Sequence, residues 1–205
     1  WELPSGRLTQ TLRPPIAEGV EGELRSVAIS PDGDLIATGG WTAIGSDAGM
    51  TLYLFSRTDG QLLGRVTSLN DLITNLCFSP DGKLLVASTA FKGIMVFGVD
   101  KTATSKLRLI AQDTDYGKLS MSADFSADSR WLATTSFDSL IRLYDVSQLT
   151  TNATAILPTL KKGTLGGKEP FTIRFSPDSS KMAVGFNDTP AVDILSSNDL
   201  SMLYR

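Results

Sequence analysis

Histidine is absent from this 205-residue sequence, and cysteine occurs only once, as Cys77. Without histidine the chain lacks the usual general base near neutral pH, and it can form neither a Ser-His-Asp nor a Cys-His catalytic arrangement. A single cysteine also excludes an intramolecular disulfide framework. We therefore expect no catalytic residues and no enzymatic activity in this chain.

The sequence also lacks a basic excess and a long hydrophobic run. Its 19 Lys and Arg residues stand against 22 Asp and Glu residues, which gives a net charge of −3 and disfavours nucleic acid as a partner. No apolar stretch approaches the length of a membrane span, and no signal-peptide pattern is present. The acidic residues lack calcium-loop spacing. We expect a cytoplasmic protein with no cofactor, no bound metal and no membrane contact.

What the sequence does contain is an internal repeat, which is the first feature to look for in such a chain. One four-residue motif recurs at intervals of 49, 47 and 50 residues. It reads SPDG at 30–33 and 79–82, SADS at 126–129 and SPDS at 176–179. Such even recurrence predicts a repeated structural unit.

The chemistry of the motif predicts a tight turn between two antiparallel strands. Proline fits the second position of a type I turn, and aspartate at the third position can hydrogen-bond the local backbone. Glycine at the fourth position takes a left-handed conformation without a Cβ penalty. Ser129 and Ser179 replace that glycine, so those two turns should be strained or of another type.

Short alternating strands flank every copy of the motif, and no long segment has helical period. Four antiparallel strands in a repeat of this length are typical of a β-propeller blade. We therefore predict an all-β fold with complete blades over 24–66, 72–110, 119–157 and 170–205. The expected fourth strands are Leu62–Val66, Leu107–Ile110, Ala155–Leu157 and Met202–Tyr204, and Pro158–Pro170 is expected to be a long connection.

A half blade is expected over residues 1–12. Aligning Trp1 with Phe55 and Gly6 with Gly60 makes the chain start at the end of a third strand and continue through a fourth over 7–12. Four and a half blades predict an incomplete ring, finished by another chain or by residues outside this one. The alternative is a small ring that closes on itself and leaves the N-terminal strand loose.

These residues resemble the WD-repeat propeller family over nearly the whole chain. Leu143-Tyr144-Asp145 is similar to the family's Trp-Asp signature, and Trp1-Glu2 holds the same place. The Asp–His–Ser/Thr–Trp network of many members cannot form here, because there is no histidine. WELPSGRL and ELRSVAISPDG also resemble bacterial propellers joined to caspase-like peptidase domains, which implies a sensor or scaffold attached to a peptidase.

In such a propeller, the loops entering each first strand and those joining second to third strands gather on one face. Aromatic and charged side chains there suit a protein interface. The first blade has the longest second-to-third loop, near Trp41–Met50, and a loop lengthened in one blade is a candidate contact element. The candidate partner-binding residues are Arg25, Trp41, Asn70, Asp71, Phe91, Tyr116, Lys118, Phe137 and Lys168. Phe91 and Phe137 could alternatively pack between blades.

The sequence thus favours a non-catalytic interaction or regulatory scaffold. A second hypothesis is a propeller that binds or acts on a small molecule in its central funnel, with Arg25, Asp71 and Lys118 lining the pocket. A third is that the chain only completes another chain's ring.

Overall fold

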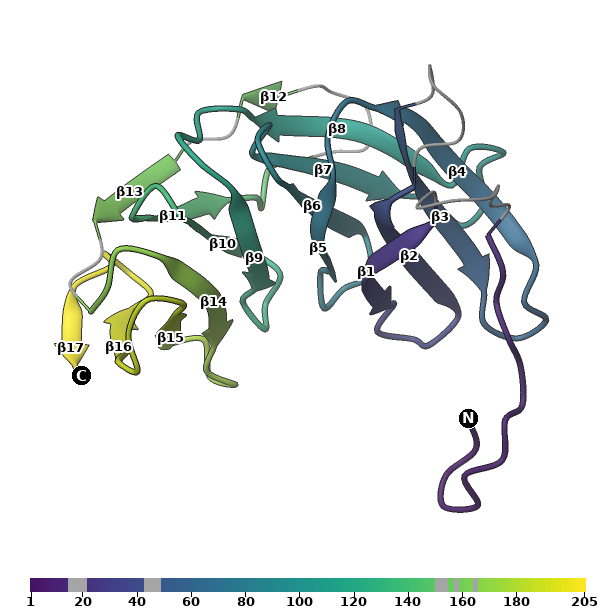
Figure 1. Ribbon diagram of the computed structural model, residues 1–205, viewed down its shortest axis with the longest axis horizontal. Coiled ribbons are helices and arrows are strands. Elements are labelled where there is room, and N and C mark those ends of the chain that lie inside the picture. The colour runs from purple at the N-terminus through teal and green to yellow at the C-terminus, as the bar shows by residue number, and fades with distance from the viewer. Residues whose placement is uncertain (15–21, 43–48, 150–154, 157–158, 164–165) are drawn as a thin grey trace.

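The computed structural model describes residues 1–14, 22–42, 49–149, 155–156, 159–163 and 166–205. Every regular element in these residues is a β-strand, and they include no helix long and apolar enough to cross a membrane. The strands form four separate sheets that follow one another along the chain and stand side by side in an open arc (Figure 1).

Each sheet corresponds to one predicted blade, with the first strand innermost in the arc (Figure 1). The first blade contains β1 (Glu23–Ile29), β2 (Leu35–Trp41), β3 (Met50–Ser56) and β4 (Leu62–Leu69). The second contains β5 (Ile73–Phe78), β6 (Leu84–Thr89), β7 (Ile94–Val99) and β8 (Leu107–Asp113). The third contains β9 (Ser120–Phe125), β10 (Trp131–Ser136), β11 (Leu140–Asp145) and β13 (Thr159–Gly163). The fourth contains β14 (Pro170–Phe175), β15 (Lys181–Phe186), β16 (Val192–Ser196) and β17 (Met202–Tyr204). Neighbouring strands within these four sets are antiparallel.

The third blade differs from the prediction in its fourth strand. The expected strand Ala155–Leu157 is not the partner of β11. Instead β12 (Ala155–Ile156) pairs in parallel with β8 of the second blade. The true fourth strand is β13, which lies within the stretch expected to be a connection. Sequence misleads here because an outermost strand needs little apolar character, and charged edge strands are common.

The N-terminal residues also differ from the prediction. No strand forms over residues 7–12, and the only pairing in residues 1–14 is an isolated antiparallel bridge between Glu2 and Arg7. A strand needs a neighbouring strand for its backbone groups. The described residues offer no such strand beside this segment. Gln10 and Leu12 lie against the first blade near Gly60, and the segment extends away from that blade toward the N-terminus (Figure 1).

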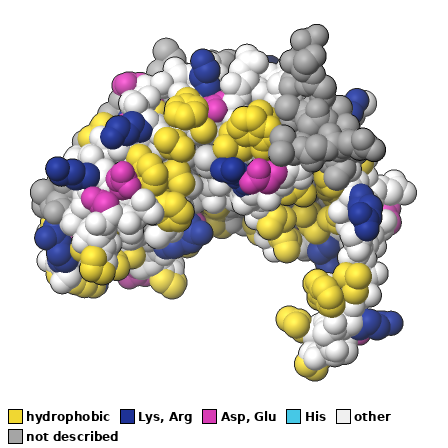
Figure 2. Space-filling view, viewed as in Figure 1, with side chains coloured by type: hydrophobic (Ala, Val, Ile, Leu, Met, Phe, Trp, Pro, Cys, Tyr) yellow, Lys and Arg dark blue, Asp and Glu magenta, His cyan; other side chains and the backbone are white. Residues whose placement is uncertain are grey.

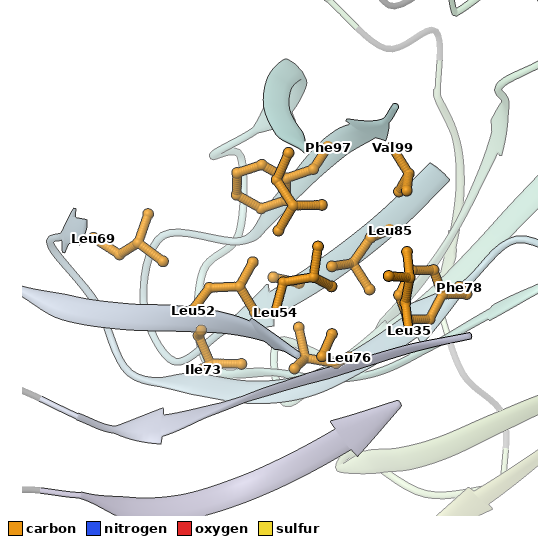
Figure 3. Close-up of a cluster of buried hydrophobic side chains, with 13 residues drawn as sticks. Leu35, Leu52, Leu54, Leu69, Ile73, Leu76, Phe78, Leu85, Phe97 and Val99 are labelled. Atoms are coloured by element: carbon orange, nitrogen blue, oxygen red, sulfur yellow. The ribbon is translucent and has the colours of Figure 1, made fainter. Parts of the chain in front are cut away.

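Apolar cores between successive blades hold the arc together. In the first core, Leu52 and Leu54 of β3 point toward Leu85 and Phe97 of the second blade (Figure 3). Alternation along β6 divides the second blade between two cores, because Leu85 packs toward the first blade while Leu84 and Val86 pack toward the third. A third core joins the third and fourth blades through Ile141, Leu143, Met182 and Val184, among others. Each blade therefore buries the face that meets a neighbouring blade.

The repeated turn behaves as its chemistry predicts. In the first copy Gly33 N donates to Ser30 O at 2.8 Å, and the Asp32 carboxylate accepts from Ser30 Oγ at 2.7 Å. Gly33 has a φ of 76°. Ser129 and Ser179 keep the same left-handed backbone at φ values of 61° and 58°, so the prediction of strain in those two turns is confirmed.

Candidate partner-binding face

We call the loops that enter each first strand, together with the loops that join second to third strands, the loop face. In three blades one backbone hydrogen bond of 2.9 Å joins the two kinds of loop: Ala90 N to Leu72 O, Phe137 N to Leu119 O and Asn187 N to Glu169 O. The two loops of each of these blades therefore lie together, as the sequence predicted.

An aspartate adds a second tie between the same loops in the second blade. Asp71 is buried, and its carboxylate accepts hydrogen bonds from Leu72 N at 2.9 Å, from Lys92 N at 2.6 Å and from Phe91 N. These bonds occupy both carboxylate oxygens with backbone donors. Asp71 thus fixes the conformation of the loop that carries Phe91.

The third and fourth blades use an aspartate from the opposite loop for the same purpose. Asp138 accepts from Gly117 N at 3.0 Å, and Asp188 accepts from Lys168 N at 2.8 Å. Burial acts to raise the pKa of Asp138, but the hydrogen bonds from Arg142 and Gly117 outweigh it and leave the pKa lowered. The backbone hydrogen bond from Lys168 lowers the pKa of Asp188. Both carboxylates are therefore ionised acceptors at neutral pH.

Tyr116 replaces the missing histidine network in the third blade. It is 9% exposed, and its hydroxyl lies 2.7 Å from Thr134 Oγ1 and 2.7 Å from the Tyr144 hydroxyl. Tyr144 in turn donates to Asp113 Oδ2 at 2.9 Å. Burial raises the pKa of both tyrosines, so both remain neutral. Tyr116, proposed from sequence as a contact residue, is thus a buried part of the framework.

Arg142 completes this buried network, and sequence reasoning overlooked it. Its guanidinium carbon lies 3.8 Å from the centre of the Tyr116 ring. Its Nη2 donates to Asp138 Oδ2 at 2.6 Å and to Asp115 O at 2.7 Å. The sequence did contain a signal for this position. Arg142 alternates with Ile141 and Leu143 along a central strand, so its side chain must lie on the other face of the sheet, which also meets a blade.

Six of the nine candidate residues are exposed, and one of these, Arg25, lies within β1 and not on the loop face. Phe91 is 68% and Trp41 42% exposed. The other four are Arg25, Asn70, Lys118 and Lys168. Part of the long loop between Trp41 and Met50 lies outside the described residues. The exposed set combines two aromatic rings with an excess of basic side chains.

The two candidate phenylalanines occupy different environments. Phe137 is half-buried, and its ring centre lies 6.2 Å from that of Phe171 in the fourth blade. It therefore packs between blades, as the alternative interpretation allowed. Phe91 projects into solvent from a loop that Asp71 holds in place, so it is the better candidate for contact with a partner.

The residues of the small-molecule hypothesis do not share one pocket. Arg25 lines a pocket of about 320 Å³ beside β1, and Asp71 lines a different one of about 360 Å³. Lys118 lines neither. Arg25 is also paired with Glu23 at 3.0 Å. This arrangement gives the three residues no common funnel site.

Four-stranded antiparallel sheets, stacked through their faces around one side of a common axis, define this protein as an open β-propeller. The family model described as "WD domain, G-beta repeat" matches residues 7–47, 60–97 and 116–145. These matches cover more than half of the chain, and the chain belongs to this family. The resemblance seen in the sequence is thereby confirmed at the level of the family.

One region of a longer protein is similar in sequence to part of this chain. The small ribosomal subunit protein RACK1y of Oryza sativa subsp. japonica is 35% identical over 89 residues. The match covers 43% of this chain and 23% of that relative. This chain therefore matches about a quarter of the relative's length.

Proposed function

We propose that this chain is a non-catalytic protein-interaction module that binds a protein partner through its loop face. The observation that carries the proposal is Phe91, a largely exposed aromatic ring on a loop whose backbone is fixed by Asp71. A rigid aromatic loses little conformational entropy on binding, and aromatic residues often dominate interface energies. Lys92, Lys118 and Lys168 add positive charge to the same face, which favours a partner with an acidic rim.

We further propose that the module belongs to a divergent bacterial branch in which the propeller regulates an attached caspase-like peptidase domain. The support is the resemblance of the WELPSGRL and ELRSVAISPDG segments. Blades from outside this chain would complete the ring. A cytoplasmic location is consistent with the ribosomal relative.

The test is affinity capture from the source cells, followed by titration of the purified partner. The partner should bind wild-type chain and lose at least tenfold in affinity to Phe91→Ala. Leu62→Ala is the matched control, because Leu62 is 41% exposed on the outermost strand of the first blade. The loop face would be refuted as the binding site if the partner bound both variants as tightly as wild type. It would also be refuted if its affinity for both variants fell by the same factor.

A further inference from the structure

The outer strands of the first two blades leave a groove between them. β4 and β8 lie on the outer rim of the arc (Figure 1), and residues of both strands line two hollows. The smaller hollow, of about 230 Å³, lies between Gly64 and Leu107. The larger, of about 360 Å³, lies between Leu69 and Leu109. Both strands advance in the same direction from the first hollow to the second. The two hollows therefore follow one another along one seam, and we call them together the seam groove.

The larger hollow has an apolar floor that is only partly covered. Leu107 belongs to the core between the first two blades and is 7% exposed. Leu109 lies two residues further along β8 and is 37% exposed. Met95 of β7 packs against the same core and also lines the hollow. The core thus does not cover Leu109, which stays accessible beside a methionine whose flexible side chain can adapt to a ligand.

The seam groove carries an excess of positive charge. Among the described residues that line it, the charged side chains are those of Arg65, Lys92, Lys106 and Asp71. Both oxygens of the Asp71 carboxylate already accept backbone hydrogen bonds. Lys106 Nζ donates to two carbonyl oxygens of the loop between β7 and β8, at 2.8 Å and 2.9 Å, which holds its charge in place. Figure 2 shows basic side chains with acidic ones beside them on one face of the molecule, so three cations around one engaged carboxylate are a local feature.

The length and the polar groups of the seam groove suit an extended peptide. Its lining along the first blade runs from Gly64 to Asn70, which corresponds to about 20 Å at about 3.3 Å per residue. An extended segment of about six residues spans that length. Asn70 and Gln112 are exposed and line the larger hollow. Their amide groups can each donate to and accept from a peptide backbone.

We propose that the seam groove binds an extended acidic segment of a protein partner. An apolar side chain of that segment sits on Leu109 and Met95, and carboxylates on either side of it lie near Arg65 and Lys106 at one end and near Lys92 at the other. The positive groove and the acidic segment are complementary in charge. The apolar floor favours a peptide over a nucleic acid, whose backbone contacts are made to phosphate and sugar. This inference rests on the proposed interaction function and names the chemistry of the partner.

The test selects binders of the wild-type chain from random eight-residue peptides displayed on phage. We expect the selected peptides to carry Asp or Glu on both sides of a Leu, Ile, Met or Phe. Synthetic copies should bind more weakly in about 0.3 M than in about 0.05 M NaCl, because salt screens exposed charges. Copies with Asn and Gln in place of the acidic residues should lose at least tenfold in affinity.

A first pair of chain variants locates the apolar contact. Leu109→Asp should lower the affinity for the selected peptides at least tenfold. Leu203→Asp is the matched control, because Leu203 also lies on an outermost strand, that of the fourth blade. Leu109 and Leu203 are 37% and 45% exposed, so both variants should fold, which circular dichroism checks. Leu203→Asp should bind the peptides as wild type does.

A second pair of variants locates the charged contact. Arg65→Glu should weaken binding at least fivefold. Lys83→Glu changes the net charge of the chain by the same amount, and the Lys83 side chain is 77% exposed beside the turn of the second blade. Lys83→Glu should therefore leave the affinity unchanged if the contact is local and not a response to overall charge.

Several results would overturn the inference. They are a selection that yields no binders, selected peptides without acidic residues, and wild-type affinity in Leu109→Asp or Arg65→Glu. Peptides that bind Leu109→Asp but not Phe91→Ala would place the acidic contact on the loop face instead. The described lining of the seam groove does not include Phe91. A failure here therefore leaves the Phe91 measurement with the partner protein intact, and a failure of that measurement leaves the peptide result intact.

Discussion

Ser129 Oγ accepts a hydrogen bond from the backbone N–H of Asp81 at 3.0 Å, and this bond links the turns of the third and second blades. Ser179 Oγ does the same for Ala127 N at 2.8 Å. Both serines occupy the place of a turn glycine and adopt positive φ. The hydroxyl thus compensates for a backbone conformation that glycine would adopt without strain.

Replacing Ser129 separates these two effects. Ser129→Ala keeps the left-handed strain and loses the bond, so we expect a loss of about 1 kcal/mol in the free energy of unfolding. Ser129→Gly loses the bond but removes the strain, so its stability should lie between those of Ser129→Ala and wild type. Urea denaturation measures both. If Ser129→Ala is as stable as wild type, the bond contributes nothing.

Removal of the Tyr116 hydroxyl tests the network that replaces the histidine arrangement. Tyr116→Phe keeps the ring beneath Arg142 but leaves the Thr134 hydroxyl without its buried partner and Tyr144 with only Asp113, so we expect a loss of about 2 kcal/mol in the free energy of unfolding. Tyr204→Phe is the control, because Tyr204 is 55% exposed, and it should change stability by less than about 0.5 kcal/mol. Equal thermal midpoints for the two variants would contradict the network's role.

The Arg142–Asp138 ion pair should contribute far more than a comparable pair at the surface. Its two side chains are 1% and 10% exposed, and removing one partner of a buried pair costs about 3 to 5 kcal/mol. Arg142→Ala should therefore be strongly destabilised. Arg130→Ala breaks the Arg130–Asp145 pair, whose side chains are 53% and 31% exposed, and should cost less than about 1 kcal/mol. Denaturant unfolding measures both variants. If they lost similar amounts of unfolding free energy, the buried pair would contribute no more than the surface pair.

The turn aspartates predict loss of stability in acid. Hydrogen bonds from the Ser176 hydroxyl and from the backbone and side chain of Ser180 lower the pKa of Asp178 from 3.8 to about 2. A group whose pKa is lower in the folded state stabilises the fold above its unfolded pKa, and this stabilisation is lost as pH falls toward the folded pKa. The stability difference between wild type and Asp178→Asn should therefore shrink between about pH 4 and pH 2. A constant difference across that range would show that the ionised carboxylate contributes nothing.

Much of the fold could be predicted because each blade is specified locally. The turn motif and the alternation of apolar and polar residues around it were enough to predict the strands of each sheet. The prediction of an all-β propeller is confirmed. The prediction failed at β13, because an outer edge strand is chosen by pairing geometry and not by apolar character. The contact residues of the loop face remain a proposal.

Sequence by itself determined the repeat, the turns and the left-handed position of Gly33, since these depend on residues a few positions apart. Tertiary structure alone decided which side chains are buried. Tyr116 and Phe91 have similar sequence surroundings at loops, yet Tyr116 lies beneath Arg142 while Phe91 projects into solvent. Exposure depends on what the neighbouring blade places opposite a residue, and those neighbours are distant in the chain.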